Sequence, residues 1–353
     1  MKKILIILFF LTHTSVHSLG IKFEKIFEGL NKPWSLSFIN KENIILTEKN
    51  GKLFTLNIVS KSINEIKHNL SLVNLGQGGL LDVLYYDKQI YISYSENRGN
   101  WETSTSVSKG IFNQKNIEFT NIFRAEPPIE SGYHFGSRLV IKDEHLYITV
   151  GERGEGMIAQ DFTKHPGSIV RIKLDGNIPE DNPKFKSNPD WLPEIFLIGV
   201  RNPQGIALSP YDNKIYLTNH GAKGGDWFGI ANFGENYGWK LLGWGGTNYS
   251  GTKIGPKWRP GFTKAIKYWV PSIAVSAMTI YKGETFKEWN GNALITSLKD
   301  QSLRKIKFKD NNLISEKIIF QGNIGRIRDI KVQKETGDLY MLSDNGELWR
   351  MYK

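Results

Sequence analysis

Apolar and polar residues alternate with a period of two along most of the chain. In a strand, such alternation turns apolar side chains to one face and polar side chains to the other, so the pattern predicts many short β-strands. Gly, Asn, Asp and Pro separate the runs, which is typical of turns. No stretch shows the period of a long amphipathic helix, so we expect an all-β protein.

One phrase returns along the chain: a turn, a short apolar run that often holds an aromatic residue, and usually a Thr or Ser. Its six copies are Asn43–Thr47, Gln89–Ser93, His145–Thr149, Lys214–Thr218, Asn292–Thr296 and Asp338–Leu342. A repeated strand unit is the signature of a propeller, whereas a β-sandwich would not keep repeating it. The copies therefore predict a six-bladed β-propeller of four-stranded antiparallel sheets.

Two further expectations concern how the ring is built. A last strand near residues 348–352 is expected to pair with an N-terminal strand near residues 21–27, because closure protects the sheet edges. The irregular spacing of the copies predicts long loops at residues 97–128 and 222–267. Loops on one face of a propeller converge on the central channel, so polar residues far apart in sequence are expected to meet there.

The N-terminus has the pattern of a targeting signal. Lys2 and Lys3 precede the apolar run Ile4–Leu11, and small residues follow at Ser15–Ser18. The apolar run is too short to span a bilayer, so we expect a signal peptide over residues 1–19 and export, to a bacterial periplasm. Residues 20–353 are then expected to form a single propeller domain with no membrane span.

The composition of the chain excludes several kinds of site and partner. The 353 residues include no cysteine, which excludes disulfides, thiolate metal ligands and a cysteine nucleophile. The formal charge is +11, or about +9 without the two N-terminal lysines. Lysines often occupy alternate strand positions, as at Lys305, Lys307 and Lys309, which is typical of a solvated strand face. With export, this argues against a nucleic-acid partner and leaves a small anionic ligand or an anionic surface.

His134 stands just ahead of a predicted hairpin. Its two strands are Leu139–Ile141 and Leu146–Val150, joined at Lys142–Glu144, and a loop rich in Gly, Arg and Glu follows. A histidine without a visible partner is most often an ordinary polar loop residue. At the mouth of a propeller channel, however, the same residue becomes a candidate general base.

Cationic residues flank the recurring strands. The principal members of this set are Arg201, Lys299, Arg326 and Arg328. Burying them around one axis is costly unless anionic charge compensates, so the set predicts a polyanionic small ligand, whose carboxylates Arg binds in a bidentate way. Singly, each cation has an ordinary interpretation, such as a salt bridge from Arg326 to Asp329 or a solvated Lys299 beside Asp300.

The glycine-rich loop from Gly221 to Asp226 can turn backbone carbonyls toward a hard cation such as Ca²⁺, although a plain turn explains it as well. The acid spacing of an EF-hand is absent, as are HExxH and GxSxG. The segment GERGEG at residues 151–156 lacks the pattern of a phosphate loop.

Taken together, the motifs resemble those of the soluble aldose sugar dehydrogenases that depend on pyrroloquinoline quinone (PQQ), the glucose/sorbosone dehydrogenase family of six-bladed propellers. The matching segments are Gly29–Leu36, Gly76–Asp82, His134–Leu139, Ala159–Asp161, Arg201–Gly205, Asn236–Trp239, Pro271–Ala274 and Arg326–Asp329. They follow the family order over nearly the whole mature chain, and together they are specific.

The resemblance implies an enzyme that oxidises aldoses to lactones and passes hydride to PQQ, with Ca²⁺ as Lewis acid. It implies that His134 is the general base and that Gln77 lies beside it. The residues implied to contact the cofactor are Arg201, Asn202, Ser272, Lys299, Arg326 and Arg328. The residues implied to offer carbonyls to Ca²⁺ are Gly221 and Ala222. An electron acceptor, either a cytochrome or a soluble quinone, would complete the cycle.

Three positions depart from the family pattern, and all lie at the cation loop. Asn219 and Trp227 stand where the family usually has acids, and Ala222 stands where proline is frequent. Two other functions fit a propeller: a Ca²⁺-dependent sugar lactonase, which would need converging carboxylates, and a non-catalytic binding module. The combination of His134 with the cations favours the dehydrogenase.

Overall fold

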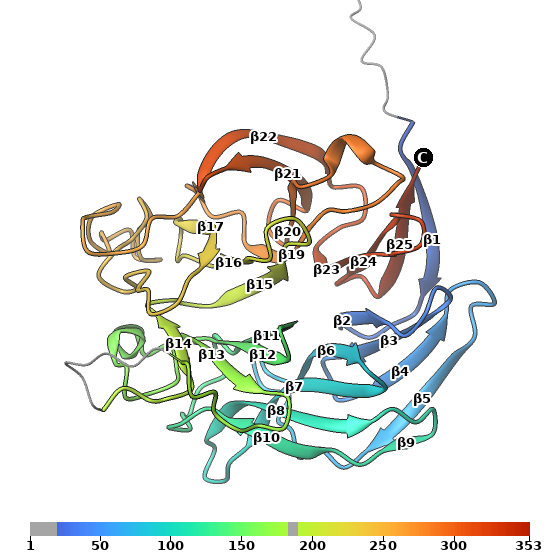
Figure 1. The fold of residues 1–353 in the computed structure, drawn as a ribbon, viewed down its shortest axis with the longest axis horizontal. Helices are drawn as coiled ribbons and strands as arrows, with labels where there is room; N and C mark the ends of the chain where they lie inside the picture. The colour runs from blue at the N-terminus through green and yellow to red at the C-terminus, as the bar shows by residue number, and fades with distance from the viewer. Residues whose placement is uncertain (1–19, 183–189) are drawn as a thin grey trace, which may run out of the picture.

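The computed structural model describes residues 20–182 and 190–353, and the signal peptide predicted over residues 1–19 lies outside the described residues. In the described residues, six sheets are arranged around a central axis as the blades of a propeller (Figure 1). Their strands pair antiparallel, except that a short fifth strand in the first blade pairs parallel at its outer edge. The fold is therefore the six-bladed, all-β propeller that the repeated phrase predicts. The described residues contain no helix long and apolar enough to cross a membrane.

The first three blades, each from its innermost to its outermost strand, are built as follows. Blade 1 contains β2 (Pro33–Phe38), β3 (Asn43–Glu48), β4 (Leu53–Asn57), β5 (Ile63–His68) and the short β9 (Asn116–Ile117). Blade 2 contains β6 (Leu80–Tyr86), β7 (Gln89–Asn97), β8 (Thr103–Ile111) and β10 (Thr120–Arg124). Blade 3 contains β11 (Gly136–Lys142), β12 (His145–Val150), β13 (Ser168–Lys173) and β14 (Ile195–Ile198).

The other three blades follow the same order. Blade 4 contains β15 (Pro203–Leu208), β16 (Ile215–Asn219), β17 (Asp226–Ala231) and β18 (Lys267–Trp269). Blade 5 contains β19 (Val275–Ile280), β20 (Ala293–Ser297), β21 (Ser302–Lys309) and β22 (Asn312–Gln321). Blade 6 contains β23 (Ile327–Val332), β24 (Leu339–Ser343), β25 (Glu347–Tyr352) and β1 (Lys22–Glu28). Two short 3₁₀ helices occupy loops: η1 (Gly156–Gln160) and η2 (Lys287–Trp289).

The six repeated phrases are the second strands of the six blades, β3, β7, β12, β16, β20 and β24. The predicted closure is also confirmed, since β1 pairs antiparallel with β25 and sets Lys22 opposite Tyr352. The prediction of a long loop at residues 97–128 is wrong, because this segment contains β8, β9 and β10. Its Ser and Thr residues alternate too weakly in hydrophobicity to be recognised as a strand. The predicted loop at residues 222–267 includes β17 and is irregular beyond it.

The hydroxyl that ends most copies of the phrase ties one blade to the next. In blade 1 the Thr47 hydroxyl accepts a hydrogen bond from the Ser35 N–H (3.2 Å) and donates to the carbonyl of Leu81 in blade 2 (2.6 Å). The equivalent hydroxyl of Ser93 bonds the carbonyl of Ser137 in blade 3 (2.6 Å). Thr149 and Thr218 bond carbonyls in blades 4 and 5 in the same way, at 3.1 and 3.0 Å.

The innermost strands of the six blades share an irregularity in their pairing, and several of these hydroxyls bond to the backbone there. Each of the strands β2, β6, β11, β15, β19 and β23 shifts its register near its first residues, as at a β-bulge. A bulge leaves a backbone N–H without a partner in the ladder. In blades 1, 2 and 3 the Thr or Ser hydroxyl accepts this N–H, from Ser35, Asp82 and Arg138 respectively. Apolar clusters then fill the spaces between neighbouring blades, for example around Trp227 between blades 3 and 4.

Candidate active site

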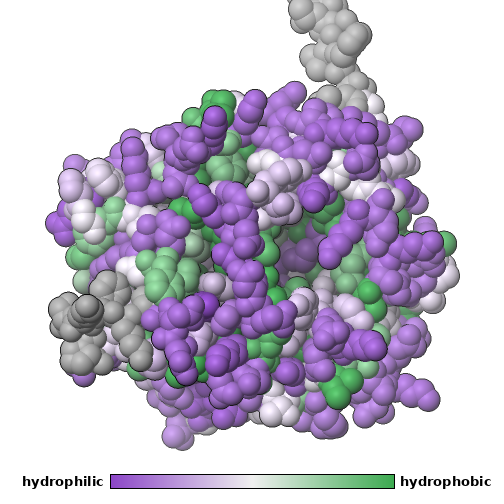
Figure 2. Space-filling model, viewed as in Figure 1, coloured by the Kyte–Doolittle hydropathy of each residue, from purple (hydrophilic) through white to green (hydrophobic). Residues whose placement is uncertain are grey.

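A cavity of about 420 Å³ lies where the innermost strands begin. Its walls come from the segments just before these strands and from the loops that join the second and third strands of the blades. Residues from blades 1 to 6 line it, so it lies on the axis of the ring, as the loop argument predicts. Figure 2 shows a largely hydrophilic face that is hollowed near its centre.

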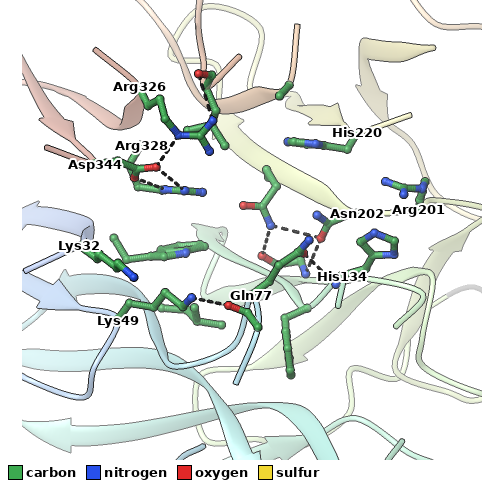
Figure 3. A pocket seen from close by; sticks show the side chains of 18 of the residues that line it. Lys32, Lys49, Gln77, His134, Arg201, Asn202, His220, Arg326, Arg328 and Asp344 are labelled. Atoms are coloured by element: carbon green, nitrogen blue, oxygen red, sulfur yellow. Dashed lines mark hydrogen bonds and ion pairs between the residues drawn. The ribbon is translucent and has the colours of Figure 1, made fainter. Parts of the chain in front are cut away.

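His134 lies on the wall of this cavity and is held at both its backbone and its ring (Figure 3). Its backbone N–H donates to Oε1 of Gln77 (2.9 Å), and its ring Nδ1 lies 2.5 Å from Oε1 of Glu152. The Glu152 side chain is only 2% exposed, and the His134 side chain is 12% exposed. With Nδ1–H donating to the carboxylate, Nε2 carries the lone pair that can accept a proton.

The surroundings of His134 and Glu152 favour a neutral imidazole and an ionised carboxylate, which is the state that a general base needs. Burial lowers the pKa of His134, the hydrogen bond to Glu152 opposes this, and the nearby charge of Arg201 lowers the pKa further. Burial alone would raise the pKa of Glu152, but its contact with His134 and the N–H of Gly156 hold that pKa below its ordinary value. The ring is therefore neutral beside an ionised carboxylate.

The bulge in β11 creates the pairing of His134 with Glu152. Leu139 pairs with Ile148, and an unshifted register would then pair Gly136 with Gly151. Gly136 pairs with Val150 instead, so the register shifts by one residue. If this shifted register is followed two residues beyond Gly136 and Val150, it sets His134 opposite Glu152. A side chain at Gly151 would place its Cβ 1.9 Å from the carbonyl oxygen of His134, so this close approach requires glycine.

Arg201 and Asn202 lie beside His134 and line the same cavity (Figure 3). The side-chain oxygen of Asn219 accepts hydrogen bonds from the backbone N–H groups of Arg201 (3.0 Å) and Asn202 (2.9 Å). The Asn202 side-chain oxygen in turn accepts from the N–H of Gly136 (3.0 Å), which leaves its amino group for the cavity. Burial lowers the pKa of the Arg201 guanidinium, which is 6% exposed.

The blade 6 wall carries the two arginines predicted from the sequence. Arg326 and Arg328 both donate to the carboxylate of Asp344, at N–O distances of 3.0 Å. The interpretation of Arg326 as a partner of Asp329 is wrong, because Asp329 is fully buried and bonds Arg138 instead. Asp344 lies on the loop between β24 and β25, and nothing in its local sequence indicates that it meets these arginines.

Two lysines of blade 1 complete the cationic wall and were not identified from the sequence. Lys32 precedes β2 and Lys49 follows β3, and both line the cavity. Burial lowers the pKa of Lys49, and the positive charges of Lys32 and Arg328 lower it further. Within the described residues, five basic side chains and one carboxylate line the cavity: Lys32, Lys49, Arg201, Arg326, Arg328 and Asp344. The wall therefore fits a polyanion.

Two predicted cofactor contacts lie outside the lining. Lys299 is exposed, although the preceding Leu298 lines the cavity. Ser272 donates its hydroxyl to Asp226 (2.7 Å) and so supports the cation loop from behind. His220, in contrast, lines the cavity with an Nε2 that is buried and has no hydrogen-bond partner among the described residues.

Gly221 and Ala222 are buried in a loop that Asp226 organises. One oxygen of Asp226 accepts the N–H of Gly221 (2.8 Å), and the other accepts from Ser272 and from the N–H groups of Ala274 and Val275. The carboxylate is thus used within the protein, so a cation bound by this loop would have backbone carbonyls as its ligands. Neither Gly221 nor Ala222 belongs to the described cavity lining. No cluster of three or more His, Cys, Asp or Glu residues that could hold a metal occurs in residues 20–182 and 190–353.

The departure from the family pattern at Trp227 has a structural explanation. Its side chain turns away from the cation loop and stacks on Tyr237, with the ring centroids 4.1 Å apart. Both rings belong to the apolar cluster between blades 3 and 4. This residue therefore serves packing between blades.

Beneath the cavity, Arg138 crosses the axis of the ring. Its guanidinium bonds Asp82 of blade 2 (3.2 Å) and Asp329 of blade 6 (3.1 Å). It also donates to the carbonyls of Gln204 and Arg328, and it lies 4.1 Å above the ring of Trp34. One buried side chain from blade 3 thus contacts blades 1, 2, 4 and 6.

Comparison with known proteins agrees with this geometry. Residues 30–350 match the family model described as Glucose / Sorbosone dehydrogenase. The aldose sugar dehydrogenase YliI of Escherichia coli is 33% identical over 347 residues, covering 94% of this chain and 92% of that protein. Quinoprotein glucose dehydrogenase B of Acinetobacter calcoaceticus is 26% identical over 414 residues, covering 90% of this chain and 84% of that protein.

The solved structures include a similar protein. The apo form of the soluble aldose sugar dehydrogenase of E. coli superposes with a TM-score of 0.88 at 33% identity, covering 94% of this chain and 99% of that one. The propeller, the cavity on its axis and the match over nearly the whole chain lead to one conclusion. The chain belongs to the glucose/sorbosone dehydrogenase family and is an oxidoreductase.

Proposed function

We propose that this enzyme oxidises aldose sugars at the anomeric carbon to lactones, with PQQ as the hydride acceptor and Ca²⁺ as Lewis acid. The observation that carries the proposal is the buried His134–Glu152 pair on the wall of a cavity whose lining is strongly cationic. The names of the relatives, an aldose sugar dehydrogenase and a quinoprotein glucose dehydrogenase, support it.

His134 is the general base in this proposal. Its Nε2 takes the proton of the anomeric hydroxyl while the hydrogen on the anomeric carbon leaves with its electron pair. The bond between that carbon and its oxygen becomes the carbonyl of the lactone. Glu152 holds the ring in the tautomer with Nε2 free and stabilises the imidazolium that forms, and Gln77 fixes the backbone of His134.

The cationic wall would hold the cofactor. Arg201, Arg326 and Arg328 would bind the carboxylates of PQQ, and the amino group of Asn202 would donate to the same ligand. Bound PQQ supplies an electrophilic quinone carbon that accepts the hydride. Lys299 is exposed and lies outside the cavity lining. Ser272 acts through Asp226 on the loop whose Gly221 and Ala222 carbonyls would bind Ca²⁺.

The location and the electron acceptor follow from the same proposal. The pattern of residues 1–19 supports export to the periplasm. The catalytic cycle would then need an electron acceptor, either a cytochrome or a soluble quinone.

Both alternatives to the dehydrogenase are less well supported. A lactonase needs converging carboxylates, whereas Asp344 is the one carboxylate among the described lining residues. A binding module has no use for the His134–Glu152 pair.

The test is reconstitution of the purified mature protein with PQQ and Ca²⁺, followed by dye reduction across a panel of aldoses. Expected are the absorbance of bound cofactor and turnover that requires both additions. A protein that neither binds PQQ nor reduces dye with any aldose would disprove the proposal. Cleavage of a lactone by the same preparation would favour the hydrolase instead.

A further inference from the structure

Lys32 and Lys49 form a pair on the blade 1 wall of the cavity. The backbone N–H of Lys49 donates to the carbonyl of Lys32 (3.1 Å), so the end of β3 is tied to the start of β2. Both side chains belong to the cavity lining, on the side of Arg328 (Figure 3). Three cations from blades 1 and 6 thus share one wall.

The Lys49 ammonium is held next to the loop that carries Gln77. Its Nζ donates to the carbonyl of Gly76 (2.5 Å), and Gln77, the next residue, accepts the backbone N–H of His134. The backbone carbonyl of Lys49 also accepts the N–H of Leu80 (3.2 Å), so both ends of this loop are fixed. An ammonium has three N–H donors, and one is used here, which leaves donors for a ligand.

Neither lysine forms an ion pair with a carboxylate of the described lining. Asp344 already accepts from Arg326 and Arg328. Glu48, the residue before Lys49, uses its oxygens for the N–H of Asn31 (2.6 Å) and the side chain of Asn50 (3.3 Å). Lys49 is partly buried and Lys32 is exposed. Burial lowers the pKa of Lys49, the positive charges of Lys32 and Arg328 lower it further, and Asp344 opposes the shift.

We propose that Lys32 and Lys49 form an anion subsite that binds a carboxylate in the cavity that His134 also lines. The carboxylate has two chemical sources: the cofactor itself, or an aldose with its own acid group, such as a uronic acid. The inference rests on the proposed function, because both sources presuppose that the cavity is the PQQ site. It adds a contact that the sequence motifs do not assign.

The experiment compares wild-type protein with Lys49→Gln, Lys32→Gln and the exposed control Lys309→Gln. Titration of apo-protein with PQQ, followed by tryptophan fluorescence, gives the Kd. The ratio of kcat/KM for glucuronate to that for glucose gives the preference for an acidic sugar. Lys49→Arg keeps the charge and should restore most of any effect, and thermal melting confirms that each variant is folded.

Two results support the subsite and identify its ligand. A Kd for PQQ that rises about tenfold or more in Lys49→Gln, and less in Lys32→Gln, assigns the pair to a cofactor carboxylate. An unchanged Kd with a similar loss in the glucuronate to glucose ratio assigns it to the substrate. If both quantities match those of Lys309→Gln, the inference is wrong although PQQ binds. Failure of wild-type protein to bind PQQ would instead disprove the proposed function.

Discussion

Two layers of positive charge lie on the axis of this ring, and they are treated in opposite ways. In the lower layer Arg138 is 2% exposed and meets two buried carboxylates, two carbonyls and an aromatic ring. In the upper layer five cations share a single carboxylate within the described lining. The charge of Arg138 is compensated by protein carboxylates, whereas most of the charge on the five upper cations is left for an anionic ligand to compensate.

The lower charge therefore serves the stability of the fold, and the upper charges serve ligand binding, although both lie in one channel. A buried charge that is paired on every side stabilises one arrangement of its neighbours, and here it contacts four other blades. An under-compensated set of charges costs stability in the free protein and recovers it when a ligand binds. Four substitutions, in order of decreasing consequence, would test this contrast between the layers.

The first change, Arg138→Met, removes the lower charge. Asp82 and Asp329 then remain buried without their partner, and we expect the free energy of unfolding to fall by about 3–5 kcal/mol in urea denaturation. Arg326→Met, whose side chain is 47% exposed in the wild type, should cost less than about 1 kcal/mol. Equal losses in the two variants would contradict the distinction between the layers.

The second change, His134→Ala, tests the base in the upper layer. Turnover of an aldose should fall by about 10²–10⁴-fold, because proton transfer in the transition state is lost. PQQ should still bind, which absorbance of the loaded protein measures. His145→Ala, at the other end of the same hairpin, is the matched control and should retain activity. Retained turnover in His134→Ala would show that another group is the base.

The third change, Arg328→Ala, removes one cation that faces the ligand. The Kd for PQQ should rise by about 10–100-fold, since hydrogen bonds between charged groups contribute about 1.5–3 kcal/mol. Isothermal titration of the apo-protein measures it, with the exposed Lys115→Ala as control. An unchanged Kd would place the cofactor carboxylates elsewhere in the cavity.

The fourth change, Glu152→Gln, concerns the pH dependence of the apo-protein. The pKa of His134 is already lowered by burial, and the bond to Glu152 opposes that shift, so its loss should lower the pKa further. An NMR titration of the imidazole measures it. Because the folded protein takes up this proton less readily than the unfolded chain, His134 makes stability decrease as the pH falls below about 6.5. A higher pKa in Glu152→Gln would contradict the assignment.

The fold was largely predictable because each blade repeats one pattern. The repeated phrase marks the second strand of each blade, and in blades 1 to 3 its terminal Thr or Ser hydroxyl accepts the N–H at the bulge of the innermost strand. Six site residues predicted from the sequence line the cavity: Gln77, His134, Arg201, Asn202, Arg326 and Arg328. Their motifs place them at the starts of innermost strands, which a propeller brings together.

The residues that were missed depend on features that no local pattern records. Glu152 meets His134 only because a bulge shifts the hairpin register by one, and an uninterrupted hairpin would have set Arg153 opposite the histidine. Lys49 and Asp344 stand on loops after second strands, where their neighbours belong to other blades. The recurrence of these loops on the channel face is the signal that could have identified them.

The pairing of β1 with β25 has a consequence for how the molecule is made. Residues 22–28 are synthesised first among the described strands, yet their partner strand, β25, is the last of them in sequence. Arg326, Arg328 and Asp344 belong to the same final blade. A chain that is cut short before Arg326 therefore leaves both the seam of the ring and one wall of the cavity unfinished. The blade that closes the ring is thus also the blade that completes the cationic wall.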